Sequence, residues 1–408
     1  MELIDYRPPG GPQILALHDP AALTASYGWF VNTGARDESA DIAGASHFLE
    51  HMVFKGTARR SAEQINRELD YLGARSNAFT SEDRTVYYAS VLPECQGQAV
   101  DLLSDLMQPR LDQDLFELER QVILEEIAMY DDQPPYGAFE RAAELFFGDH
   151  PLARRVLGTI ESVSDLSVEQ LQEYHQRRYT KDNMLFVAAG RLRVDELIAQ
   201  VERLSRDFPA QASSSPQPSV EFHRQSAAVE KGLAHQHYVV MMWPGISWSD
   251  ERRFALRLLA AAIADSSSSR LFWELIDNGR AETAFVYPQF FRDCGCLTGM
   301  LCCAPQDAAE VEEIFVRTVS GVRARPIDAR ELELARQRIT SGLILADEYP
   351  QHRMFALGSA WLERQEFLSL DALLAKYAAV DVDDVAAVAD ALCAEPWVSV
   401  RVVEEPLD

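Results

Sequence analysis

Apolar residues recur along the chain in two distinct patterns. Short runs rich in β-branched and aromatic residues predict strands at residues 25–34, 83–92 and 183–190. Apolar positions spaced three or four apart predict amphipathic helices at residues 61–73, 95–108 and 113–132. Strands and helices mixed without strict alternation indicate an α+β fold, in which helices pack on one face of a mainly antiparallel sheet.

The same succession of elements recurs after a low-complexity segment. Residues 209–219, PAQASSSPQPS, are rich in Pro and Ser and have no periodic pattern, as is typical of a linker. Beyond this segment the pattern predicts strand, helix, strand and helix at residues 235–243, 250–265, 295–304 and 307–322. Because a chain of 408 residues exceeds the roughly 250–300 residues of a single core, we predict two domains, 1–208 and 220–408.

A direct comparison of the two halves indicates an internal repeat. Residues 115–135 align with residues 331–351 at a constant offset of 216. The residues shared at this offset are Leu118 and Leu334, Arg120 and Arg336, Gln121 and Gln337, Ile123 and Ile339, and Pro134 and Pro350. The acidic groups are not shared, since Glu119 aligns with Ala335 and Glu126 with Gly342. Packing alone would not predict that difference, so the second copy is interpreted as a degenerate repeat.

Composition narrows the functional classes. The 64 acidic and 38 basic residues give a net charge of −26, which argues against nucleic-acid binding because that function normally requires a basic surface. The first residues lack the basic and apolar regions of a signal peptide, and we find no run of about 18 apolar residues. Six unevenly placed cysteines agree with a reducing compartment. We therefore expect a soluble, cytoplasmic protein without a membrane span.

Two histidines and a glutamate lie close together in GASHFLEHMVFKGT, residues 44–57. On a helix, His47 and His51 are one turn apart and face the same side, so both can bind one metal ion. The order His-x-x-Glu-His is a recognised zinc-protease signature. The alternative is a pair of core histidines with a salt-bridged glutamate. The corresponding segment of the second copy, SSRLFWEL at residues 268–275, has no histidine, and this joint loss of histidines and carboxylates favours the metal.

A catalytic zinc ion usually has three protein ligands and an open position for water. Glu126, on the predicted helix 113–132, is the expected third ligand for one Zn²⁺ per chain. Glu125 competes for this role, and spacing and the repeat comparison favour Glu126 without excluding it. Glu119 lies seven residues before Glu126 on the same helical face and is expected to support the site or position the water. Glu50 is then placed to act as the general base of peptide hydrolysis.

The chain resembles the pitrilysin/insulinase-type zinc metallopeptidases, in particular the short branch that includes the β subunit of the mitochondrial processing peptidase and its bacterial relatives. The resemblance covers nearly the whole chain. It rests on GARDE (34–38), GASHFLEHMVFKGT (44–57), ARSNAFTSEDRTVYYASVL (74–92), ERQVILEEIAMYDDQP (119–134), YHQRRYTKDNMLFVAAG (174–190) and, more faintly, SSSSRLFWEL (266–275).

The resemblance implies two α+β domains that close like a clamshell around an extended peptide substrate. It implies His47, His51 and Glu126 as zinc ligands, with Glu50 as general base and Glu119 as the supporting carboxylate. It further implies that residues 76–80 form an edge strand to which the substrate adds as an extra strand. The substrate-binding residues on this strand would be Asn77, Ala78, Phe79 and Thr80.

The second half departs from the pattern of this family. Members that act alone, and the zinc-free partners of paired members, tend to carry an arginine and a tyrosine on a strand of this half. Residues 295–305, GCLTGMLCCAP, contain neither, and we expect structural roles for Arg280 and Tyr287 nearby. We therefore expect the zinc-bearing half of a heterodimer whose zinc-free homologue supplies the arginine and tyrosine, with a homodimer as the next possibility. The rival hypothesis is a catalytically silent peptide-binding or structural subunit of a larger complex.

Overall fold

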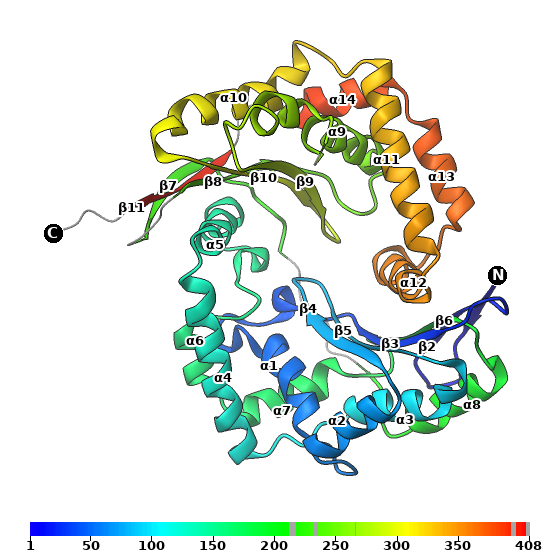
Figure 1. Ribbon diagram of the computed structural model, residues 1–408. Helices are drawn as coiled ribbons and strands as arrows, with labels where there is room; N and C mark the ends of the chain where they lie inside the picture. Colours follow the sequence, from blue (N-terminus) through cyan, green and yellow to red (C-terminus); the bar gives the residue numbers. More distant parts are fainter. Residues whose placement is uncertain (212–217, 232–235, 266, 393–396, 405–408) are drawn as a thin grey trace. The chain divides into compact units, whose positions relative to one another are not determined.

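The computed structural model describes residues 1–211, 218–231, 236–265, 267–392 and 397–404 (Figure 1). These residues form helices and mainly antiparallel sheets in two compact units. The first unit contains Met1–Ile127, Arg154–Gln217 and Ala346–Phe367, and the second contains Ala128–Ala153, Pro218–Leu345 and Leu368–Asp408. The predicted α+β fold in two parts is thereby confirmed.

A six-stranded sheet in the order β1-β2-β6-β3-β5-β4 forms the centre of the first unit. The strands are β1 Glu2–Tyr6, β2 Gln13–His18, β3 Ala25–Val31, β4 Arg75–Thr80, β5 Thr85–Val91 and β6 Met184–Gly190. All neighbouring strands are antiparallel except β2 and β6, which are parallel. Strand β4 lies at one edge and pairs with β5, so its outer side is open to a further strand.

The helices of the first unit are packed around this sheet. They are α1 Ala45–Met52, α2 Ala62–Tyr71, α3 Gln96–Leu106, α4 Gln113–Asp131, α6 Ile160–Asp165, α7 Val168–Arg178, α8 Val194–Leu204 and α12 Pro350–Arg364. On one face, Trp29 of β3 shares a core with Phe48 of α1, Leu103 of α3 and Phe116 of α4. Residues on either side of Trp29 in the strand face the opposite way, because side chains alternate along a strand.

The second unit is built in the same way on a five-stranded sheet in the order β7-β11-β8-β10-β9. The strands are β7 Gln225–Lys231, β8 His237–Pro244, β9 Thr283–Phe290, β10 Gly295–Cys303 and β11 Val398–Glu404. The helices are α5 Pro134–Phe147, α9 Arg253–Ala264, α10 Ala308–Ser320, α11 Ala329–Asp347, α13 Leu370–Ala379 and α14 Val382–Leu392. Met241 and Trp243 of β8 share one core with Leu258 of α9 and Phe315 of α10.

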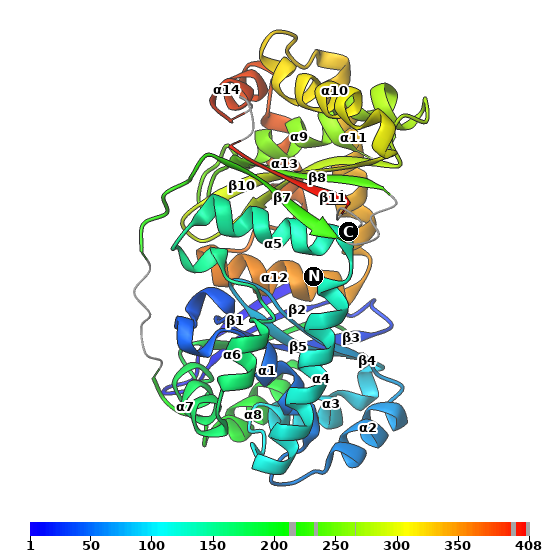
Figure 2. The same ribbon diagram turned by 90° about the vertical axis from the view of Figure 1, so that its left-hand side faces the viewer.

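Each sheet is covered on both faces, whereas the sequence predicted helices on one face. In the first unit, α12 packs Met354 against Phe30 on the face opposite α1 and α3. In the second unit, α5 packs Phe146 against Val240 on the face opposite α9 and α10. Figures 1 and 2 show α12 along the first sheet and α5 along the second. Burial from both sides accounts for the near-continuous apolar sequences of central strands such as β6.

The two units therefore differ from a simple division of the chain at residues 209–219. Helix α5 comes from the first half of the sequence and belongs to the second unit, while α12 comes from the second half and belongs to the first. Residues 212–217 of the predicted linker lie outside the described residues. The apolar face of a helix is visible in its sequence, but the sheet that this face meets is not, and the exchange could not be predicted for that reason.

The internal repeat is also a repeat of structure. Helix α11 begins and ends 216 residues after α4, and α12 begins 216 residues after α5. These helices therefore follow the offset that the sequence comparison gave. The exchange of α5 and α12 is reciprocal because both helices are the same element of the duplicated fold.

Candidate metal centre

Helix α1 carries both histidines of the predicted site. It begins after Gly44, whose φ of 95° favours glycine. A Cβ at this position would lie only 2.7 Å from a backbone oxygen, so a larger residue would clash. Phe48 and Met52 are fully buried and fix one side of the helix in the core. The rings of His47 and His51 lie together on another side, with their centroids 4.6 Å apart.

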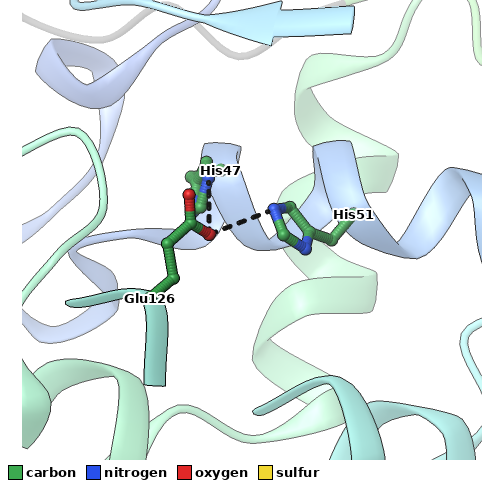
Figure 3. Close-up of side chains that lie close together, drawn as sticks. All are labelled: His47, His51 and Glu126. Atoms are coloured by element: carbon green, nitrogen blue, oxygen red, sulfur yellow. Dashed lines mark ion pairs between the residues drawn. The ribbon is translucent and has the colours of Figure 1, made fainter. Parts of the chain in front are cut away.

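Glu126 of α4 faces both imidazoles (Figure 3). Its Oε2 atom lies 3.7 Å from Nε2 of His47 and 3.5 Å from Nε2 of His51. Ligand atoms held about 2.0–2.1 Å from a tetrahedral zinc ion are about 3.3–3.5 Å apart, so these three groups fit zinc with a small adjustment. Among the described residues, this is the one group of three such side chains whose ligand atoms lie within 4.8 Å of one another.

The orientation of α4 distinguishes Glu126 from its neighbour Glu125. Phe116, Glu119 and Ile123 form the buried face of this helix at intervals of three or four residues. Glu126 continues this face and is partly buried, whereas Glu125 is exposed. In the structure, the carboxylate that lies near the two histidines is that of Glu126.

Glu119 supports the site through His51. Its Oε1 atom accepts a hydrogen bond of 2.8 Å from Nδ1 of His51, which leaves Nε2 of the same ring facing Glu126. Its Oε2 atom lies 2.6 Å from Nζ of Lys55, and the Glu119 side chain is almost entirely buried. A carboxylate in this position fixes the ring and makes the imidazole a better ligand.

Burial and neighbouring charges shift the pKa values of His47, Glu119 and His51 in different directions. Burial lowers the pKa of His47 to about 3, so its ring is neutral near pH 7. Burial would raise the pKa of Glu119, but the hydrogen bond from His51 and the ion pair with Lys55 outweigh it and lower that pKa. Burial likewise opposes the charged form of His51, and its contacts with Glu119 raise its pKa nonetheless. Zinc binding would therefore require no loss of a proton from His47, whereas it would displace any proton that His51 holds.

Glu50 lies beside the candidate ligands and contacts the edge strand. Burial raises the pKa of its carboxyl group, while hydrogen bonds from the hydroxyl and the backbone N–H of Thr80 act in the opposite direction. A carboxylate whose pKa lies above its usual range is better matched to accepting and returning a proton near pH 7. The residue between the histidines therefore has the environment of a general base.

The four predicted substrate-binding residues lie on β4. Asn77 and Phe79 are exposed, whereas Ala78 is buried and Thr80 partly buried on the opposite side. The ring of Phe79 lies 5.8 Å from that of Phe355 on α12. The strand thus places its C-terminal end beside Glu50 and keeps one row of side chains against α12.

Two residues of the site were missed by sequence reasoning. Lys55, four residues after His51, holds the outer oxygen of Glu119. Glu38 accepts hydrogen bonds of 2.7 Å from the backbone N–H of Gly44 and 2.6 Å from that of Ser46, and so anchors the start of α1. The spacing of Lys55 from His51 was the available signal for the first. Glu38 ends the GARDE motif, but the sequence did not indicate that its side chain reaches the N-terminus of α1.

Comparison with known proteins places these features in a wider group. The model of the insulinase family (peptidase family M16) matches residues 13–160, and the model of the peptidase M16 inactive domain matches residues 165–339. An uncharacterized zinc protease of Mycobacterium leprae is 37% identical over 392 residues, which cover 94% of this chain and 88% of that protein. A probable mitochondrial-processing peptidase subunit beta of Arabidopsis thaliana is 27% identical over 398 residues, covering 94% and 74%.

The fold has a close counterpart among solved structures. A protease from Helicobacter pylori superimposes with a TM-score of 0.92 over 99% of both chains, at 20% sequence identity. Within the part of the chain that the structure describes, no helix is long and apolar enough to cross a bilayer.

Proposed function

Because this chain belongs to the insulinase family of peptidases (peptidase family M16), we propose that it is a zinc-dependent endopeptidase that cleaves extended or unstructured peptides. The observation that carries this proposal is the meeting of Glu126 with the two histidines of α1, with Glu50 beside them. His47, His51 and Glu126 would hold one zinc ion. Precursor or leader processing and degradation of small peptides both fit such a site.

The roles of the protein groups follow from their positions. A zinc ion at this site would polarise the scissile carbonyl and lower the pKa of a bound water. The carboxylate of Glu50 takes the proton of the attacking water and returns it to the nitrogen of the leaving amine. Glu119 holds Nδ1 of His51 as a donor, which keeps Nε2 available throughout.

Strand β4 supplies the surface for the substrate. Main-chain pairing to its open edge would bind a peptide with little demand on sequence, and the contact of Thr80 with Glu50 brings such a peptide to the base. Asn77 and Phe79 would contact the side chains on one side of the peptide, and Ala78 and Thr80 would line the other. This arrangement favours unfolded segments over folded proteins, since a folded chain has no free strand to offer.

The absence of an arginine and tyrosine pair supports a dimer as the working form. Strand β10 contains neither residue, and Arg280 is held in an ion pair with Glu310. We expect a zinc-free homologous chain to supply the missing groups, with a second copy of this chain as the next possibility. Assay of the purified chain alone on unstructured peptides tests this, and full turnover by a monomer would contradict it.

The catalytic assignment is tested by three matched carboxylate substitutions. Glu50→Gln should keep zinc and lose turnover by about a thousandfold or more, because the proton acceptor is removed while the ligands remain. Glu126→Gln should lose zinc, whereas Glu125→Gln, one residue away and exposed, should keep both zinc and turnover. Zinc content by mass spectrometry and cleavage of a quenched fluorescent peptide are the measurements. Unchanged turnover of Glu50→Gln would refute its role, and a zinc-loaded wild type that binds peptides without cleaving them in any dimeric form would favour the silent subunit.

A further inference from the structure

A pocket of about 720 Å³ lies at the end of β4 that is remote from the candidate metal centre. Its walls come from Arg75 at the start of β4, Ser90 near the end of β5, Leu92 just after β5, Leu23 in a loop, and Tyr349 just before α12. All of these residues belong to the first unit. The metal centre does not use this pocket, since the contact of β4 with Glu50 is made by Thr80 at the opposite end of the strand.

The pocket lies in line with the proposed path of the substrate. Arg75 pairs with Ser90 and Thr80 with Thr85, so β4 runs straight from the pocket to the base. Five residues of strand span about 17 Å. A peptide paired along the open edge of β4 would therefore place the residue opposite Arg75 about five to seven positions from the bond beside Glu50.

The pocket and Phe79 lie on the same face of the sheet. Arg75, Asn77 and Phe79 alternate with buried or partly buried residues and share the side on which α12 packs. At the pocket, the hydroxyl of Ser90 donates to the side-chain oxygen of Gln351 on α12. Every second side chain of a bound peptide would thus follow α12 toward the pocket.

Exposed apolar side chains surround the opening. Leu23 is 78% exposed, Leu92 52% and Tyr349 64%, and all three line this one pocket. Its buried charges are already balanced, because Arg353 pairs with Asp19 at 2.7 Å. Apolar surface gathered around a concave site indicates a ligand that is itself apolar.

We propose that this pocket, defined by Leu23, Leu92 and Tyr349, is a remote specificity subsite that takes a bulky apolar or aromatic side chain of the substrate. The subsite rests on the proposed function, because its ligand is the peptide that β4 presents to Glu50. It provides selectivity that main-chain pairing lacks, and it favours peptides long enough to reach from the metal centre to the start of β4. Short fragments would bind more weakly and leave.

Binding to the zinc-loaded Glu50→Gln chain tests the subsite without turnover. The probes are fluorescent peptides with one common central sequence: a short peptide, and long peptides carrying Phe, Ala or Asp at the fifth, sixth or seventh residue on either side. The long peptide with Phe at one of these positions should bind about tenfold more tightly than its Asp counterpart, as expected for burial of an aromatic side chain. Fluorescence anisotropy gives the dissociation constants.

The matched variants are Leu23→Asp with Leu92→Asp, which change exposed residues of the pocket, and Ile160→Asp, which changes an exposed apolar residue on α6. The double variant should lose the preference for Phe while binding the short peptide as before, and Ile160→Asp should keep the preference. Equal binding of Phe and Asp peptides by the parent chain, or a preference retained by the double variant, would overturn the subsite. Equal cleavage of both long peptides by the wild-type chain in its active form would overturn the subsite alone, whereas failure of every dimeric form to cleave any peptide would overturn the proposed function.

Discussion

Helix α1, which carries the candidate metal ligands, and its counterpart in the second unit share their packing and differ in their polar side chains. When Gly56 is aligned with Gly279, Phe48 and Met52 correspond to Leu271 and Leu275, and all four are fully buried. The candidate ligand His47 corresponds instead to Arg270, whose guanidinium pairs with Glu331 of α11 at 2.7 Å. The apolar positions were thus kept in both copies, and only the groups facing away from the core diverged.

The backbone differs at the same place. In the first unit, α1 is an α-helix, which stacks residues four apart. In the second unit, residues Phe272–Ile276 form a π-helical turn, which widens the spacing of the turn and no longer stacks residues at that interval. A metal site therefore requires more than the right residue types, because the helix must also present them on one side.

The exchange of α5 and α12 gives the sharpest test of this duplicated architecture. Leu357→Ala in α12 should destabilise the first unit by about 2–5 kcal/mol, because it leaves a cavity against the first sheet. Phe146→Ala in α5 should destabilise the second unit by a similar amount. Hydrogen exchange of the zinc-free protein, read on β3 and β8, distinguishes the two units.

Each substitution in this pair should therefore weaken the unit that is built mainly from the other half of the sequence. Leu345→Ala, which changes an exposed residue of α11, serves as the control and should alter neither unit by more than about 0.5 kcal/mol. Loss of protection in the sequence half that carries the substitution would contradict the exchange.

Acid should lower the stability contributed by helix α7 of the first unit but not that contributed by the corresponding helix of the second unit. His175 of α7 donates from Nε2 to the carbonyl oxygen of Met107 at 3.0 Å, and burial lowers its pKa to about 4. The corresponding helix of the second unit, α14, has the buried residue Ala389 at this position. The unfolded chain binds a proton at this histidine from about pH 6.5 downward, whereas the folded chain resists it until about pH 4. Stability should fall across this window by about 3 kcal/mol.

His175→Gln should remove the part of the loss that His175 causes, because the amide keeps a donor for Met107 and has no titrating ring. The part due to His47, whose pKa burial also lowers, should remain. His352→Gln, at an exposed position of α12, is the control and should leave the pH dependence as it is. Urea unfolding of the zinc-free proteins at pH 7 and pH 5 gives the difference. An equal fall in the wild type and His175→Gln would show that other groups cause the acid sensitivity.

The contrast between α1 and its counterpart explains which parts of the fold and of the candidate site could be predicted from the sequence. Periodicity located the strands and helices, and the spacing of His47, Glu50 and His51 predicted one side of the site because helix geometry is local. Glu126 was favoured by its spacing from Glu119, by the comparison of the two copies and by the family resemblance. Lys55 and Glu38 were missed because their partners depend on tertiary packing. The exchange of α5 and α12 was missed for the same reason, because the sequence of a helix does not show which sheet it packs against.

The two copies also differ at Glu119, the residue whose carboxylate supports the candidate ligand His51. Ala335 occupies its position in the second copy, so Glu119→Ala converts one into the other. This substitution should weaken zinc binding by about 10–100-fold, because His51 loses the acceptor that fixes its ring and Lys55 loses its counter-charge. Competition with a chromophoric zinc chelator at pH 7.5 measures the effect.

Glu119→Gln distinguishes the two contributions of this residue. The amide oxygen can still accept from Nδ1 of His51, so an intermediate loss of zinc affinity is expected when only the charge is removed. Zinc affinity equal to that of the wild type in Glu119→Ala would show that the ring is fixed by packing alone.

Gly342 occupies in the second copy the position that corresponds to Glu126. Replacing it tests whether this glycine lowers the stability of α11. It lies within α11 at an exposed position, and a Cβ there would meet no atom within 4 Å. Gly342→Ala should therefore stabilise the second unit by about 0.5–1 kcal/mol, since glycine in a helix loses more backbone freedom on folding than alanine. Gly358→Ala in α12 should have the opposite effect. The new Cβ would lie 2.5 Å from the ring of Phe30, so the substitution should destabilise the first unit. Urea unfolding followed by hydrogen exchange on each sheet measures both, and a gain in stability from Gly358→Ala, or none from Gly342→Ala, would contradict this account of the two helices.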